Sequence, residues 1–261
     1  DIAEVRRGIT TGANEFFYLD REAIEKWDIE EEFLRPVIKS PRECRSIIVR
    51  PEGLRWRVFM CRKDKEVLQG TAALEYVRWG ESQGFHSRPS CRGRARWWDL
   101  PERDWAIVLW PMIHGDQQRV FWNEYTVAVD HNLFEILRHD DDLLWGSLCW
   151  TGQLLFRELH GRANLGQGAL KTEGIDIRTL YVLVASYTRL GSAIRDARHT
   201  MSRRHLEPVV QECLLSDRRA LDDIVFDALG LTQGERDAVY EAVVNLVEGR
   251  LRKAESLQGR R

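Results

Sequence analysis

The stretch Trp105–Ile113, WAIVLWPMI, is the longest apolar run without a charge in the sequence. It is too short to cross a bilayer, and its composition suits a buried strand. Shorter runs of β-type composition, separated by Gly and Pro, are Phe16–Leu19, Ser46–Val49, Trp56–Cys61 and Thr126–Val129. These runs predict a mixed β-sheet that occupies most of the chain before residue 190.

Helical patterns interrupt these strands. Thr71–Glu81 begins with a residue that can cap a helix and is followed by Gly84, which can end one. Leu143–Leu159 is apolar nearly all round, which predicts a single buried helix. We therefore expect an α+β fold in which helices are interspersed with the strands.

The pattern turns helical after residue 190. Ser216–Leu229 has Ser216 as an expected N-cap and Gly230 as an expected stop, and Thr232 with Glu235 forms a capping box for a second helix. The two helices form an αα-hairpin. The sequence thus predicts a mixed β-sheet domain over residues 1–190 and a small C-terminal helical domain over residues 191–261.

Composition indicates an ordinary globular chain. The 261 residues are 43% hydrophobic and 31% charged, with a net charge of −2, which excludes a disordered chain. The five cysteines are scattered and odd in number, which favours reduced thiols and a cytoplasmic protein over a disulfide framework. No apolar run is long enough for a membrane span, so no membrane partner is expected.

Catalytic motifs are missing from the sequence. Transfer of a methyl group to an exocyclic amine needs an Asp/Asn/Ser-Pro-Pro-aromatic loop, and the sequence has none. It also has no Gly-rich turn for adenosylmethionine or a nucleotide, and its Cys and His residues lack the paired spacings of a zinc site. We expect no catalytic residue, no metal and no cofactor in this chain.

Three stretches suit contact with DNA. The first, Arg6–Asn14, combines glycines, hydroxyls and cations that can approach a phosphate closely. A β-turn that needs glycine only for its backbone also explains it, and the residues alone favour that reading.

The second stretch is Arg88–Leu100, RPSCRGRARWWDL. Between Arg78 and Arg96 the sequence has five arginines and one acid, Glu81, which gives a local excess of about four positive charges. Arginines can grip phosphates or the edge of guanine, and an aromatic ring can pack on a base or sugar. A solvated basic loop is the alternative, and we expect at least one of Trp97 and Trp98 to lie in the core.

The third stretch, His160–Lys171, is a Gly-rich polar loop after a buried helix, able to reach a groove of DNA. The end of a helix capped by Gly161 is the alternative.

The order of four motifs resembles a known family. VRRGITTGANEFF, EFLRPVIKSPREC, RGRARWWDLP and HGRANLGQGALK follow one another as in the C-terminal target-recognition region of N6-adenine DNA methyltransferases. Those enzymes occur in restriction–modification and phage-defence systems, and the tail LDDIVFDALGLTQGERDAVYEAVVNLVEGRLRKAES is similar to their helical extension. The resemblance covers nearly the whole chain and implies that residues 1–190 are a DNA target-recognition domain.

The resemblance also implies partners and contact residues. The partners are double-stranded DNA and an N-terminal methyltransferase domain of the same parent protein, which binds S-adenosylmethionine and carries the catalytic loop. The residues to which the resemblance gives a DNA-facing role are Arg7, Thr10, Thr11, Asn14, Arg94, Arg96, Trp97, Gly161, Arg162, Asn164, Gly166 and Lys171. Arg88 and Arg92 join them as members of the basic cluster.

Two other classes of function remain open from the sequence. One is a DNA-processing enzyme, such as a nuclease, with an unrecognised site. The other is a protein-interaction module that docks a partner subunit through the Trp97–Trp98 loop and the apolar helices.

Overall fold

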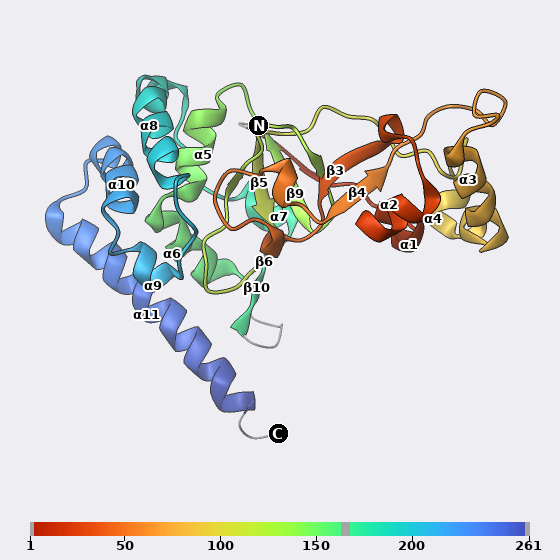
Figure 1. Cartoon of the computed structure of the whole chain (residues 1–261). Helices are drawn as coiled ribbons and strands as arrows, with labels where there is room; N and C mark the ends of the chain where they lie inside the picture. The colour runs from red at the N-terminus through yellow and green to blue at the C-terminus, as the bar shows by residue number, and fades with distance from the viewer. Residues whose placement is uncertain (1–2, 163–167, 259–261) are drawn as a thin grey trace.

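The computed structural model describes residues 3–162 and 168–258. Helices α1–α4 gather at one end of the molecule and α8–α11 at the other, with the strands between them (Figure 1). Mixed sheets with interspersed helices and a helical C-terminal region confirm the predicted α+β class. Within the described residues, no helix is both long and apolar enough to cross a membrane.

The central sheet is antiparallel and has the strand order β1-β9-β5-β7. Its strands are β1 (Glu4–Arg7), β5 (Val108–Pro111), β7 (Phe121–Trp122) and β9 (Leu133–Leu137). The apolar run Trp105–Ile113 thus supplies a buried strand, as predicted, but the strand ends at Pro111. Ile113–His114 forms a separate strand, β6, which pairs with β10 (Leu170–Lys171).

A second sheet has the order β2-β4-β3-β8 and belongs to the end that carries α1–α4. Its strands are β2 (Tyr18–Leu19), β3 (Leu34–Ile38), β4 (Trp56–Phe59) and β8 (Ala128–Val129). The helices here are α1 (Asn14–Phe17), α2 (Arg21–Trp27), α3 (Ala72–Ser82) and α4 (Pro89–Arg92). Phe16 and Phe17 are helical, so the strand predicted over Phe16–Leu19 is shorter than expected.

The single helix predicted over Leu143–Leu159 is wrong. The structure has two helices, α5 (Asp141–Cys149) and α6 (Thr151–His160), separated by the extended backbone of Trp150. The buried Asp222 carboxylate accepts hydrogen bonds from the backbone N–H of Thr151, at 2.7 Å, and from its hydroxyl. This remote side chain therefore caps the start of α6, which no local pattern could reveal.

The helical region contains α7 (Gly174–Arg178), α8 (Gly191–Met201), α9 (Val209–Glu212), α10 (Ser216–Leu229) and α11 (Gln233–Gln258). The Thr232–Glu235 capping box and the left-handed Gly230 after α10 are confirmed. The predicted cap of α10 is wrong, because Ser216 is the first helical residue and its side chain makes no capping bond.

The hydrophobic core crosses residue 190. Ile194 of α8 and Leu221 and Val225 of α10 belong to the same cluster as Leu109 and Trp145. A second cluster lies between α1, α3 and the sheet of β2, β3 and β4, and a small third one joins α6, α9 and α11. The division at residue 190 stays a prediction about domains, and packing is continuous across it.

Candidate nucleic-acid interface

The first and second predicted stretches are held together by one side chain. The Arg94 guanidinium donates hydrogen bonds to the backbone carbonyls of Thr10, at 3.1 Å, and Thr11, at 2.7 Å. It also donates to the carbonyl of Trp97, at 3.2 Å. Arg94 therefore fixes the loop of the first stretch on the second, and its donors point at backbone oxygens of the protein.

The first and third stretches also meet. Arg7 Nε donates to the carbonyl of His131 at 2.9 Å, and its guanidinium lies 3.6 Å from the sulfur of Met112. The backbone N–H of Thr172 donates to the carbonyl of Met112 at 2.9 Å, which places Lys171 and its strand beside this position. Three segments far apart in sequence thus lie side by side, with the first stretch between the other two.

The pKa of Glu173 also indicates that the first and third stretches lie close together. The hydrogen bond from Lys171 lowers the pKa of the Glu173 carboxyl, and the charges of Lys171, Arg7 and Arg162 lower it further. Lys171 contacts this carboxylate, and Arg7 and Arg162 lie near enough to act on its charge. We call the surface formed by Arg7, Thr10, Asn14, Arg88, Arg92, His131, Asn132, Arg162 and Lys171 the recognition strip.

A close backbone contact requires glycine in the middle of the recognition strip. A Cβ atom on Gly8 would lie 2.3 Å from the carbonyl oxygen of Asp130, closer than any side chain tolerates. The backbone N–H of Ile9 donates to Val129 at 2.8 Å, and that of His131 donates to Ile9 at 3.0 Å. Gly8 therefore lets the first stretch lie directly against the 129–133 turn.

The local charge excess predicted for the second stretch is largely neutralised. Arg78 pairs with Glu75, and Arg88 pairs with Glu15 at 2.9 Å. Arg96 binds both Asp64, at 2.7 Å, and Asp99, at 2.8 Å. A count over a sequence window misses acids that the fold brings from other segments, so the predicted basic patch is smaller than expected.

Two residues of the second stretch that were predicted to contact DNA, Trp97 and Arg96, are held by other parts of the protein. Trp97 is only 8% exposed, its ring centroid lies 4.5 Å from that of Phe16, and its indole N–H donates to Glu81 at 3.1 Å. Trp98 is buried as well, so both tryptophans belong to the core. Arg96 is held by its two carboxylates, which leaves Arg88 and Arg92 as the outward cations of this stretch.

The first stretch also contains both buried and exposed residues among those predicted to contact DNA. Thr11 is 1% exposed, and its hydroxyl donates to the side-chain oxygen of Asn14. Thr10 and Asn14 are exposed. Only these two and Arg7 are therefore placed to meet a ligand without rearrangement.

The third stretch leaves α6 and returns along β10. Gly161 ends α6 with its N–H donating to Arg157, and Arg162 forms a β-bridge with Lys171. The Arg162 side chain lies 3.3 Å from Asp176, and Lys171 pairs with Glu173. The predicted contacts Asn164 and Gly166 lie outside the described residues.

Two polar residues of the strip, His131 and Asn132, were not predicted from the sequence. Buried Asp130 organises them, because its carboxylate bonds the His131 ring at 3.1 Å and the Asn132 N–H at 2.9 Å, and also accepts from the Tyr18 hydroxyl. The signal was present as three polar residues, Asp130–Asn132, directly after a β-type run.

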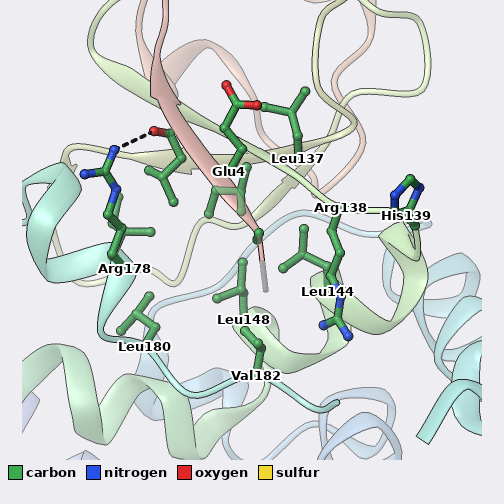
Figure 2. Close-up of a pocket in the computed structure, with 13 residues that line it drawn as sticks. Glu4, Leu137, Arg138, His139, Leu144, Leu148, Arg178, Leu180 and Val182 are labelled. Carbon is green, nitrogen blue, oxygen red and sulfur yellow. Dashed lines mark hydrogen bonds between the residues drawn. The ribbon is translucent and has the colours of Figure 1, made fainter. Parts of the chain in front are cut away.

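A separate apolar pocket opens between β1, β9 and the segment that follows α7. Its volume is about 1080 Å³, and Figure 2 shows Leu144, Leu148, Leu180 and Val182 around it, with Glu4 and Arg178 at its edge. Ile175 of α7, and Tyr181 and Val184 of the segment that follows it, are large, apolar and exposed. This apolar face is distinct in character from the polar recognition strip.

Comparisons with known proteins agree on one group. Residues 1–213 match the family described as "Type II methyltransferase M.Eco57I, C-terminal domain". The type II methyltransferase M.AccI of Acinetobacter calcoaceticus is 24% identical over 190 residues, which cover 67% of this chain and 34% of that protein.

The crystal structure of the type IIG restriction endonuclease BpuSI superposes with a TM-score of 0.61 and 15% sequence identity. The match covers 96% of this chain and 30% of that one, and at this identity it shows a shared fold. The chain thus spans about a third of the length of either protein.

Proposed function

The chain belongs to the family of C-terminal domains of type II methyltransferases, a region of restriction–modification proteins, and from this we propose that it recognises a specific sequence in duplex DNA. The observation that carries the proposal is that the first stretch joins the other two: Arg94 of the second stretch bonds Thr10 and Thr11, and Arg7 contacts Met112, which Thr172 bonds next to the third. In the proposal, the methyltransferase is elsewhere in a longer parent protein, binds S-adenosylmethionine and modifies the N6 amine of adenine. A role in defence against phage places that protein in the cytoplasm.

The recognition strip offers two kinds of contact. Arg7, Arg88, Arg162 and Lys171 supply charge for phosphates, and exposed ion pairs such as Arg88–Glu15 contribute only about 0–1 kcal/mol, so a phosphate can replace the carboxylate. Thr10, Asn14, His131 and Asn132 carry the short polar groups that can reach base edges. The strip would hold the duplex in register while the methyltransferase flips the target base.

Replacing Arg7 by alanine tests the centre of the strip. We expect weaker binding to every duplex, with the slope of log K against log salt reduced by about one, because Arg7 would neutralise one phosphate. Fluorescence anisotropy over a salt series measures both quantities. Arg195→Ala removes an exposed, ion-paired arginine on α8 and serves as the matched control. Equal binding by Arg7→Ala and wild type would remove the strip from the DNA site.

We further propose that the apolar face receives the methyltransferase domain of the parent protein. The relatives are about three times as long as this chain, so a large additional part needs a contact surface. The pocket is lined by Leu148, Leu180 and Val182, and Tyr181 beside it is 71% exposed. Apolar exposure of this kind is typical of a surface that another domain covers.

Tyr181→Glu in the parent protein tests this docking surface. We expect the free energy of association between the two domains to weaken by about 2 kcal/mol or more, because a charge would be buried against apolar groups. Limited proteolysis would then cut faster between the two parts. Tyr125→Glu, at a tyrosine before β8 that is 47% exposed, is the matched control. Unchanged proteolysis of Tyr181→Glu would exclude this face as the domain interface.

A further inference from the structure

A groove of about 690 Å³ lies between the segment after β3 and the turn that joins α8 to α9. The segment includes Arg42, Arg45 and Arg50, and the turn includes Arg203 and Arg204. The backbone N–H of Leu206 donates to the carbonyl of Arg45 at 2.8 Å and joins the two sides. In Figure 1 the orange segment between β3 and β4 reaches toward the helical end of the molecule.

Four of the arginines that line this groove have no acidic partner among the described residues. Arg42, Arg45, Arg50 and Arg203 are exposed, and among residues 3–162 and 168–258 none of them has an acidic side chain within 4.0 Å or a side-chain hydrogen bond. We call these four residues the arginine groove.

Three acidic residues near the arginine groove already have partners. Glu43 accepts hydrogen bonds from the backbone N–H groups of Ser40, at 2.8 Å, and Arg55, at 3.3 Å. Glu212 and Asp217 both bind Arg204. These three carboxylates therefore do not neutralise Arg42, Arg45, Arg50 or Arg203.

A fifth arginine outside the groove, Arg119, lies close enough to Arg42 to feel its charge. Burial lowers the pKa of the Arg119 guanidinium, and the charge of Arg42 lowers it further, although Asp116 opposes both effects. Clustered cations repel one another, and an anionic partner relieves that repulsion. The same cluster does not suit a membrane-spanning or apolar partner.

The form of the groove indicates which anion it fits. A small anion held tightly requires donors fixed in place, whereas these four side chains are exposed and free of hydrogen bonds in the described part of the chain. A phosphodiester backbone presents charges at regular intervals and needs only mobile cations along its path. The groove combines residues from two segments, as contact with an extended polymer requires.

We propose that the arginine groove binds the phosphate backbone of duplex DNA that flanks the recognised sequence. The proposal rests on the DNA-binding function proposed above and adds a second, sequence-independent contact surface. It implies that affinity depends on duplex length as well as on sequence, because a short duplex reaches only the recognition strip.

The test compares a duplex of about 12 base pairs with one of about 30 that contains the same central sequence, in a salt series. The variant Arg42→Ala/Arg45→Ala, and separately Arg203→Ala, should lose affinity for the long duplex. The salt slope should fall by about two for the double variant and by about one for Arg203→Ala. Binding to the short duplex should stay as in wild type. Arg78→Ala, on α3 at the opposite end of the molecule, is the matched charge control.

The outcomes separate this proposal from the function on which it rests. If the groove variants bind both duplexes like wild type while Arg7→Ala is weaker, the groove proposal is overturned and the recognition function stands. If wild type binds neither duplex at low salt, both proposals fail. Thermal unfolding midpoints equal to that of wild type show that the variants are folded.

Discussion

Replacement of Trp97 by alanine is expected to lower the free energy of unfolding by about 3–5 kcal/mol. The side chain is 8% exposed and packs on Phe16, and Gly80 lies so close that a Cβ there would be 2.6 Å from its ring. Removal of the indole leaves a cavity that the closely packed neighbours cannot fill, and the Glu81 carboxylate loses a hydrogen-bond donor. Chemical denaturation followed by circular dichroism measures the loss.

Trp97→Phe is the matched control for this prediction. It keeps an aromatic ring against Phe16 but loses the hydrogen bond to Glu81, so we expect a clearly smaller loss. The result decides between two roles for Trp97. A Trp97→Ala variant that unfolds like wild type but binds DNA poorly would give the ring the base-contacting role that the sequence resemblance implies.

The second large effect is expected at Glu212. This carboxylate is 2% exposed and accepts hydrogen bonds from Arg204, at 2.6 Å, and Arg218, at 3.2 Å, as well as from the N–H of Glu207. Burial raises the pKa of Glu212, but the hydrogen bond from Arg204 and the charge of Arg218 outweigh it, so its pKa lies below the ordinary value. The carboxylate is therefore ionised in the folded protein.

Glu212→Ala should lower the free energy of unfolding by about 3–5 kcal/mol, because Arg218, which is 1% exposed, loses its bonded counter-ion. Denaturant titration at neutral pH measures this. Glu212→Gln keeps the volume and some hydrogen bonds, so its smaller loss would isolate the contribution of charge. Equal stability of Glu212→Ala and wild type would mean that Asp217 and Asp222 neutralise the arginines without it.

Depressed pKa values also fix the direction of the pH effect. A carboxyl whose pKa is lower in the folded than in the unfolded protein stabilises the fold above its unfolded value and loses this contribution as the pH falls. The difference in stability between wild type and Glu212→Gln should therefore shrink as the pH falls below about 4.5, the ordinary pKa of the group.

Features that depend on neighbours in sequence could be predicted. Thr71 caps α3, Thr232 and Glu235 form their capping box, and Gly230 takes the left-handed conformation after α10. Each involves groups within a few residues, whose geometry the helix itself fixes. The order of the motifs also indicated the family, because motif order can be read from the sequence without any knowledge of contacts.

The composition of the candidate site depends on contacts between distant segments. Asp222 breaks the predicted helix at Trp150, Glu15 and Asp64 neutralise Arg88 and Arg96, and Arg94 turns its donors toward the backbone of Thr10 and Thr11. Each of these partners is more than 30 residues away, so no window of sequence contains both members.

The sequence alone therefore determined the fold class, the local caps and the family, because short-range backbone geometry and motif order suffice for these. Tertiary structure decided which cations are free. It buried Trp97, paired Arg96 and left Arg42, Arg45 and Arg203 without acidic partners among the described residues. The physical reason is that the charge available to a ligand is a sum over neighbours in space, and folding brings those neighbours together from distant parts of the chain.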